Sequence, residues 1–292
     1  MTLSGTNTYI IAAGAGRAAV IDPGPPLEEH IDAIEAALAK GAKIEAILVT
    51  HGHPDHAPGA ALLRRRTNAP VYAHPNARFP HDISLNDNEQ LPVANIRIVA
   101  LDAPGHADDH LVYVLAEEEA LFTGDVVIGE GTVVIAPPLG NMRDYQATLE
   151  RLLLHYGDAQ AIYGGHGPEI TSVRAKLVEY IEHRKMRERQ LLAALAQGPA
   201  TVPDLVRTIY ANVNPVVWPA AARQMIAYLN ALRDEGRIDV VPVDREPSAE
   251  DADILNPDLS RLAKIGNLDP VAAEELGVHM GREALHSYAI KI

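Results

Sequence analysis

The chain has 292 residues, of which 47% are hydrophobic and only 4% aromatic, so it can bury one large aliphatic core together with a smaller domain. Its formal net charge of −14 argues against broad binding of nucleic acids, because an acidic protein has no long-range attraction to a phosphate backbone. The lack of cysteine excludes disulfide bonds and thiolate metal ligands. Residues 1–7 do not resemble a secretion signal and no apolar run has the length of a membrane span, so we expect a cytoplasmic protein without membrane contact.

The first part of the chain, residues 1–170, alternates short apolar runs with helical patterns. Strands are predicted at residues 8–12, 18–21, 46–49, 70–73, 96–101, 111–115, 120–123 and 159–163, and helices at 27–39 and 144–155. This order is typical of an α+β fold in which two packed β-sheets lie between outer helices, an αββα sandwich.

Helical periodicity replaces the strands from residue 171 onward. The spacing predicts helices over 173–197, 202–210 and 219–235, followed by a short hairpin at 236–243. Three helices and a wing are the outline of an all-α winged-helix-like domain, which we place at residues 171–243. The remainder, residues 244–292, is expected to be a polar linker at 245–251 and a helical tail with helices near 258–264 and 270–288.

Side chains that suit a catalytic zinc ion gather in four short clusters. The clusters are THGHPDH at residues 50–56, PGH at 104–106, TGD at 123–125 and GGHG at 164–167. Three of them directly follow a predicted strand, where a rigid sheet holds side chains in place. A His-x-His pair alone is weak evidence, but four such clusters together predict a centre of two metal ions, for which imidazole and carboxylate ligands are suitable.

The predicted ligands divide between two ions. They are His51, His53, Asp55, His56, His106, Asp125 and His166. His51 and His53 alternate on an extended loop and are expected to bind one zinc ion together with His106. Asp55 and His56 are expected to bind the second with His166.

Two of these carboxylates are also predicted to be catalytic. Asp125 is expected to bridge the ions, and Asp55 to orient the attacking hydroxide. Asp22 follows a strand and has two interpretations, a carboxylate partner for a ligand histidine or an ordinary turn cap. Two Zn²⁺ per chain are predicted, although manganese or iron would also accept these ligands.

The clusters, in this order, resemble the metallo-β-lactamase-fold hydrolase superfamily. Further segments resemble its β-lactamase-like-protein-2 group, which has a C-terminal winged helix: residues 5–10, 121–126, 129–134, 164–168 and 180–188. The resemblance runs from about residue 5 to 243 and carries all seven ligands over. It implies a hydrolase, and the group includes a single-strand endoribonuclease and carrier-protein thioesterases. A true β-lactamase is not expected, because Asp125 stands where lactamases carry Cys or Ser.

The favoured function is hydrolysis of a small carboxyl ester, thioester or lactone. The acidic charge, the pair Asp108-Asp109 beside the predicted site and the scarcity of aromatic residues for base stacking favour it. A single-strand endoribonuclease or other phosphodiesterase is the alternative. The three arginines at 64–66 and the basic run at 184–189 supply local positive charge for it, but both are more simply interpreted as exposed helix residues.

A third hypothesis makes the winged helix a nucleic-acid-binding or regulatory module. Its predicted recognition helix, residues 219–235, contains only Arg223 and Arg233 as basic residues, which is little for reading base edges. We expect a small-molecule substrate, do not favour RNA, and regard the helical tail as a candidate contact between subunits of a homo-oligomer.

Overall fold

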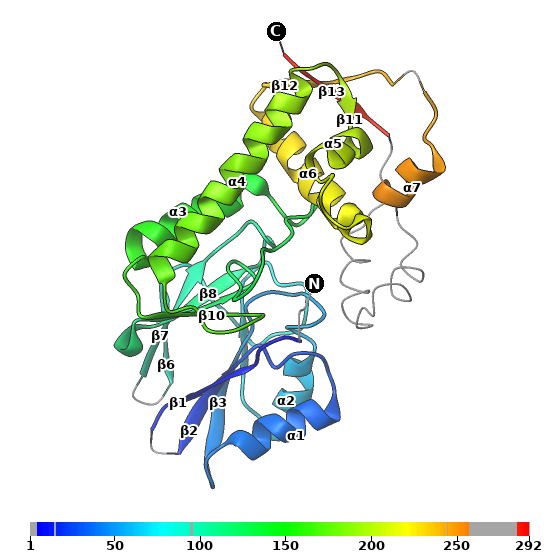
Figure 1. Ribbon diagram of the computed structural model, residues 1–292. Helices are drawn as coiled ribbons and strands as arrows, with labels where there is room; N and C mark the ends of the chain where they lie inside the picture. Colours follow the sequence, from blue (N-terminus) through cyan, green and yellow to red (C-terminus); the bar gives the residue numbers. More distant parts are fainter. Residues whose placement is uncertain (1–4, 15, 94–95, 244, 257–284, 292) are drawn as a thin grey trace.

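Two five-stranded β-sheets pack face to face in the N-terminal half of the protein (Figure 1). The computed structural model describes residues 5–14, 16–93, 96–243, 245–256 and 285–291. The first sheet has the order β1-β2-β3-β4-β5, with β1 antiparallel to β2 and the other neighbours parallel. Its strands are β1 (Tyr9–Ala12), β2 (Arg17–Ile21), β3 (Lys43–Leu48), β4 (Val71–Ala73) and β5 (Ile83–Ser84).

The second sheet has the order β10-β9-β8-β7-β6 and is antiparallel except for the pair β9–β10. Its strands are β6 (Glu89–Val93), β7 (Ile96–Asp102), β8 (Leu111–Leu115), β9 (Ala120–Gly124) and β10 (Ala161–Gly164). The space between the sheets is filled by buried apolar side chains from both, among them Ile21, Leu48, Ile98 and Tyr113. This layer fixes the distance between the strand ends that carry the predicted ligands.

Helices cover the outer face of each sheet, as the sequence predicts (Figure 1). α1 (Glu28–Ala37) and α2 (Gly59–Thr67) pack on the first sheet through buried residues such as Ile31 and Leu63. α3 (Met142–Tyr156) and α4 (Val173–Leu195) lie on the second. The αββα sandwich is therefore confirmed. None of the described helices has the length and apolar character needed to cross a membrane.

The C-terminal unit contains the predicted helices and also a sheet. α5 (Val202–Ile209) and α6 (Trp218–Asp234) lie beside one end of α4. β11 (Ala200–Thr201), β13 (Ser287–Ile290) and β12 (Ile238–Val241) form a three-stranded antiparallel sheet in that order. The winged helix is thus present, but it is not all-α. Its apolar core is continuous with the core under the second sheet, so where one domain ends and the next begins stays a prediction.

Three local predictions after residue 235 differ from the structure. The segment 236–243 forms one strand that pairs with β13 from the end of the chain, and not a hairpin. The predicted linker contains the start of α7 (Ala249–Leu255), because Ser248 and Asp251 form a capping box at its N-terminus. Of the predicted tail helices, residues 258–264 and 270–284 lie outside the described residues, and Ser287 and Tyr288 belong to a strand.

Tyr288 tests the role of β13. β13 lies between β11 and β12, and its Tyr288 side chain is buried in the apolar core, whereas Ile290 of the same strand is 37% exposed. We expect Tyr288→Ala to lower the free energy of unfolding by about 3 kcal/mol through the lost burial and the cavity it leaves. The matched control Ile290→Ala should lower it by less than about 1 kcal/mol. Urea denaturation measures both values. Equal losses of unfolding free energy in the two variants would show that Tyr288 of β13 does not contribute to this core.

Candidate metal centre

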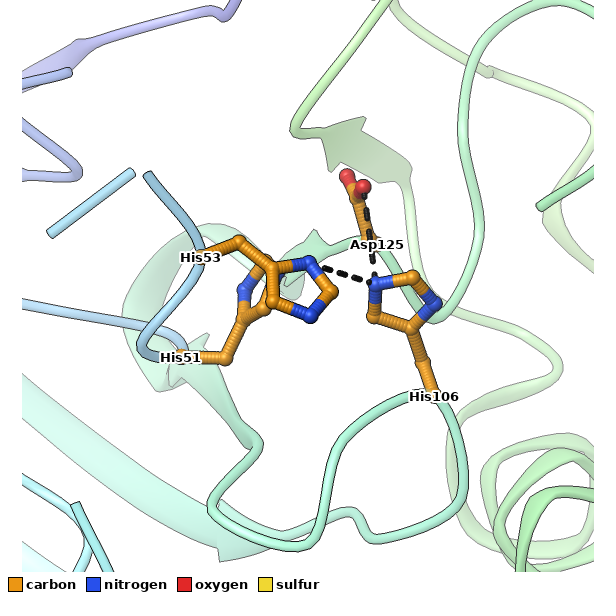
Figure 2. A group of neighbouring side chains, drawn as sticks. All are labelled: His51, His53, His106 and Asp125. Atoms are coloured by element: carbon orange, nitrogen blue, oxygen red, sulfur yellow. Dashed lines mark hydrogen bonds and ion pairs between the residues drawn. The ribbon is translucent and has the colours of Figure 1, made fainter. Parts of the chain in front are cut away.

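All seven predicted ligands converge at one end of the sandwich. Loops that follow β3, β9 and β10 and the loop between β7 and β8 carry them, and each side chain is buried. In space they form two groups, within each of which one potential ligand atom per residue lies within 4.8 Å of the others. The first group is His51, His53, His106 and Asp125 (Figure 2), and the second is Asp55, His56 and His166.

In the first group, ring nitrogens and a carboxylate face one another. Nδ1 of His53 lies 3.1 Å from Nε2 of His106, which is 3.8 Å from Oδ2 of Asp125 (Figure 2). The His51 ring centroid lies 4.3 Å from that of His53 and 5.1 Å from that of His106. Three buried imidazoles this close together would repel one another if protonated, and this favours their neutral form, which can bind a metal ion.

The second group is built around the other oxygen of Asp125. Oδ1 of Asp125 is 3.6 Å from Nε2 of His56 and 3.4 Å from Nε2 of His166. Oδ2 of Asp55 lies 3.4 Å and 3.3 Å from the same two nitrogens. The two carboxylate oxygens of Asp125 are thus divided between the groups, which is the arrangement a bridging ligand requires.

Backbone carbonyls set the tautomers of two histidines. Nδ1 of His106 lies 3.1 Å from the carbonyl oxygen of Val134, and Nδ1 of His166 lies 3.0 Å from that of Gly5. A carbonyl oxygen can only accept a hydrogen bond, so Nδ1 of each of these histidines carries the proton. Nε2 of each then directs its lone pair into the centre. This orientation by a second hydrogen bond is characteristic of histidines that bind metals.

Asp22 sets the tautomers of two more histidines. Its carboxylate accepts hydrogen bonds from the Thr50 amide and hydroxyl, both at 2.7 Å, and from Nδ1 of His56 at 2.8 Å. Because the single hydroxyl proton of Thr50 goes to Asp22, Thr50 Oγ1 accepts from Nδ1 of His51 at 3.0 Å. The structure therefore favours the carboxylate-partner interpretation of Asp22 over the turn cap.

The electrostatics of the centre favour a cation at its middle. Burial, reinforced by neighbouring histidines, holds the pKa of His51 well below its ordinary value, and burial lowers the pKa of His53 to about 4. Burial also acts to lower the pKa of His166, but Asp125 outweighs it and raises that pKa to about 10. Asp125 keeps a strongly lowered pKa despite burial, because His166 and His56 stabilise its charge. Divalent ions would supply this positive charge without protonating the ligands.

Several buried atoms of the centre have no hydrogen-bond partner within the described residues. They are Nε2 of His51, Nε2 of His56, Oδ1 of Asp55 and Oδ1 of Asp125. Leaving a buried polar atom unsatisfied costs about 1–3 kcal/mol, so four in one place are unfavourable unless a ligand engages them. Imidazole nitrogens and carboxylate oxygens together fit zinc, manganese or iron.

The sequence assigned Thr6 no role at the centre and His110 only a structural one, but both support the predicted ligands. The Thr6 hydroxyl donates to Oδ2 of Asp55 at 2.6 Å. His110 accepts from the Asp125 amide at 3.1 Å and stacks on His51 with ring centroids 4.6 Å apart. Gly165 leaves room for the ligands, since a Cβ there would lie 2.5 Å from Oδ1 of Asp125. The segment 5–10, which resembles the β-lactamase-like-protein-2 group, was the signal for Thr6.

The acidic pair Asp108-Asp109 near the centre carries less unpaired charge than the sequence indicates. Asp108 is paired with Arg78 through two hydrogen bonds of 2.7 Å, so its charge is offset. Asp109 is buried, and burial, with the nearby charge of Asp108, raises its pKa. The pair therefore presents less negative charge beside the centre than its sequence indicates.

The two basic runs are also less available for RNA than their sequence indicates. Arg64 donates to Asp82 at 2.7 and 2.6 Å, and Arg66 donates to Asp32 at 2.6 Å. The prediction that Arg184 lies on a solvated helix face is wrong, because its side chain is 1% exposed.

Comparison with known proteins identifies the class. Residues 1–166 match the family described as the metallo-beta-lactamase superfamily, and residues 201–243 match the beta-lactamase associated winged helix domain. The chain therefore belongs to the metallo-beta-lactamase superfamily and is a hydrolase of that superfamily. This confirms the predicted family and fold.

Particular relatives place the chain within the superfamily. It is 33% identical over 250 residues to the Beta-lactamase-like protein 2 homolog of Caenorhabditis elegans, covering 82% of each chain. It is 36% identical over 223 residues to the Atrochrysone carboxyl ACP thioesterase of Aspergillus chevalieri, covering 72% of this chain and 70% of the relative. A solved metallo-beta-lactamase family protein from Thermus thermophilus has a TM-score of 0.67 at 26% identity, covering 81% of this chain and 91% of that one.

Asp22→Asn tests the hydrogen bonds behind the centre. The Thr50 hydroxyl and Nδ1 of His56 donate to Oδ2 of Asp22, whereas the Thr50 amide donates to Oδ1. The single oxygen of an asparagine amide can replace only one of these two acceptors, and its NH₂ group then faces donors at the other position, so the support of His51 and His56 is disturbed. We expect zinc affinity, measured by competition with a chelator, to fall about 10- to 100-fold. The control Asp32→Asn removes an exposed carboxylate from α1 and should leave zinc affinity unchanged. Wild-type affinity in Asp22→Asn would remove this residue from the support of the centre.

Proposed function

We propose that the protein is a dinuclear metal-dependent hydrolase of a small carboxyl ester, thioester or lactone. The division of the Asp125 carboxylate between the two ligand groups is the observation that carries the dinuclear part of the proposal. His51, His53 and His106 would hold one ion with Asp125. Asp55, His56 and His166 would hold the other, with Asp125 shared. Zn²⁺ is the metal we favour for this set of nitrogen and oxygen ligands.

When bound, the two ions activate water at neutral pH and polarise the oxygen of the scissile group. The residues of the protein would hold the ions and orient the attacking water. Asp125 keeps the two groups at a fixed separation, because its backbone amide is anchored on His110 and its side chain is enclosed by Gly165. Asp55 is fixed through Oδ2 by Thr6, which leaves its buried Oδ1 to accept a proton or a hydrogen bond from the attacking water.

A carbonyl substrate is favoured over a phosphodiester for two reasons. A relative that is 36% identical is named a thioesterase of an acyl carrier protein, and the alignment spans 72% of this chain. The net charge of −14 gives no general attraction to RNA, and Arg64 and Arg66 are engaged by acidic neighbours. Attack on a thioester carbonyl breaks the C–S bond and releases a thiol and a carboxylic acid, with water as the only other reactant.

A substrate panel on metal-replete protein tests the proposed function. The panel contains an acyl thioester of N-acetylcysteamine, an aryl ester, a lactone, bis-p-nitrophenyl phosphate and a single-stranded RNA. We expect kcat/KM for at least one carbonyl substrate to exceed that for the phosphodiester by about 100-fold or more, which corresponds to ~2.7 kcal/mol of transition-state discrimination. RNA cleavage without turnover of any carbonyl substrate would reverse the assignment. Asp125→Ala, which removes the shared ligand, is the control for adventitious hydrolysis.

Asp55→Asn separates the orienting role of Asp55 from its role as a ligand. The amide keeps an oxygen that can bind metal but is a much poorer proton acceptor. We expect kcat to fall about 100-fold, within the usual range for loss of a general base, while metal content stays close to two ions per chain. Metal content is measured by inductively coupled plasma mass spectrometry on the protein used for kinetics. An unchanged kcat would confine Asp55 to metal binding.

A further inference from the structure

Arg184 of α4 is a buried cation with no role in the proposed chemistry. Its guanidinium lies 4.9 Å from the ring centroid of Tyr145 and donates to Oε1 of Gln224 at 3.1 Å. It also donates to Oγ1 of Thr132 at 2.7 Å and to the carbonyl of Val133 at 2.9 Å. All of these partners are neutral. An apolar side chain would fill the same space without the desolvation of a charge, so packing alone does not account for an arginine here.

Two of the partners of Arg184, Thr132 and Val133, belong to one segment, residues 132–135, which is held from two helices of the C-terminal half. Arg184 reaches Thr132 and Val133 from α4. Gln224 of α6 accepts from the amide of Ile135 at 3.1 Å with the same oxygen that receives Arg184. The segment is therefore clamped at its beginning and its end by two side chains that are hydrogen-bonded to each other.

The carbonyl at the middle of this segment contacts a predicted metal ligand. Val134 O accepts from Nδ1 of His106, as described above, while the preceding carbonyl of Val133 faces Arg184. Rotation or displacement of the segment would move both carbonyls together. It would release the His106 ring from the orientation in which Nε2 faces Asp125 and His53.

We propose that Arg184 and Gln224 are positioning residues that fix His106 through the carbonyl of Val134. Docking of the C-terminal helices then becomes part of the assembly of the metal centre. This inference rests on the proposed function in one respect, since it requires His106 to bind a metal ion. It adds residues that lie outside the ligand set and outside the loops that carry it.

Arg184→Met removes the guanidinium and its hydrogen bonds while filling much of the same volume. We expect it to weaken binding of one of the two zinc ions by at least about tenfold, as loss of a group that orients a ligand histidine typically does. The visible absorption spectrum of the cobalt-substituted protein should change, because the geometry at the His106 ion changes. In metal-free protein, ¹⁵N chemical shifts of the His106 ring should show a mixture of tautomers in place of one.

Thr132→Val is the second variant, since Arg184→Met could impair folding. It removes the Thr132 hydroxyl, which accepts a hydrogen bond from Arg184, and leaves the packing of α4 and α6 intact. We expect weaker zinc binding in the same direction and a smaller change in the cobalt spectrum. Tyr228→Phe is the matched control, because it removes a buried hydrogen bond of 3.0 Å to the carbonyl of Arg184 without touching residues 132–135. It should lower stability and leave zinc affinity and spectrum at wild-type values.

The outcomes separate the inference from the proposed function. The first outcome is that the wild-type protein binds two ions and that both Arg184→Met and Thr132→Val keep the wild-type zinc affinity, cobalt spectrum and His106 tautomer. This would overturn the positioning role alone. Equal losses of zinc affinity in Tyr228→Phe and Thr132→Val would overturn it too, since general loosening would then explain both. If the wild-type protein fails to bind two metal ions, the proposed function fails first, and the inference with it.

Discussion

The buried carboxylate of Asp125 is the constraint around which the candidate metal centre is organised. It is buried between two groups of imidazoles and shows one oxygen to each. Burying several imidazoles and carboxylates together costs free energy, because they lose their hydration. Other parts of the fold therefore have to hold them in place. The apolar layer between the sheets does this, because it fixes the ends of β3, β9 and β10 relative to one another. Burial of apolar side chains between the sheets thus stabilises the fold and offsets the unfavourable free energy of collecting polar groups at the proposed centre.

A set of hydrogen bonds from distant parts of the chain keeps the centre in one geometry. Asp22 acts on His51 through Thr50 and on His56 directly, while Thr6 fixes Asp55. Each of these contacts removes a rotational freedom that a bound ion would otherwise have to remove. These hydrogen bonds hold the ring nitrogens facing inward, which reduces the entropic cost of binding an ion.

The sequence predicted the side chains that converge at the candidate centre and most regular elements, but only part of the contacts between them. Histidine and aspartate in short, ordered clusters are chemically distinctive, so His51 to His166 could be found without coordinates. The carboxylate of Asp22 was also among the predicted partners of a histidine, but the supporting carbonyls of Gly5 and Val134 could not be predicted, because a backbone carbonyl has no signature in a sequence. The pairing of β12 with β13 was missed for a similar reason, since the partners are far apart in the sequence and each strand is short. Helical periodicity also predicted Arg184 as exposed, because a basic run within a helix is usually solvated.

The burial of α6 bears directly on the role of the winged helix. A recognition helix has to present an exposed face that fits the major groove of DNA. Here most of α6 is packed into the shared core, and Arg223, one of its two basic residues, is buried and donates to the carbonyl of Leu255. Reading a base with Arg223 would require this helix to leave the core that also holds Gln224 against Ile135. The same burial that makes α6 unsuitable for DNA makes it suitable as a rigid support behind the proposed metal centre.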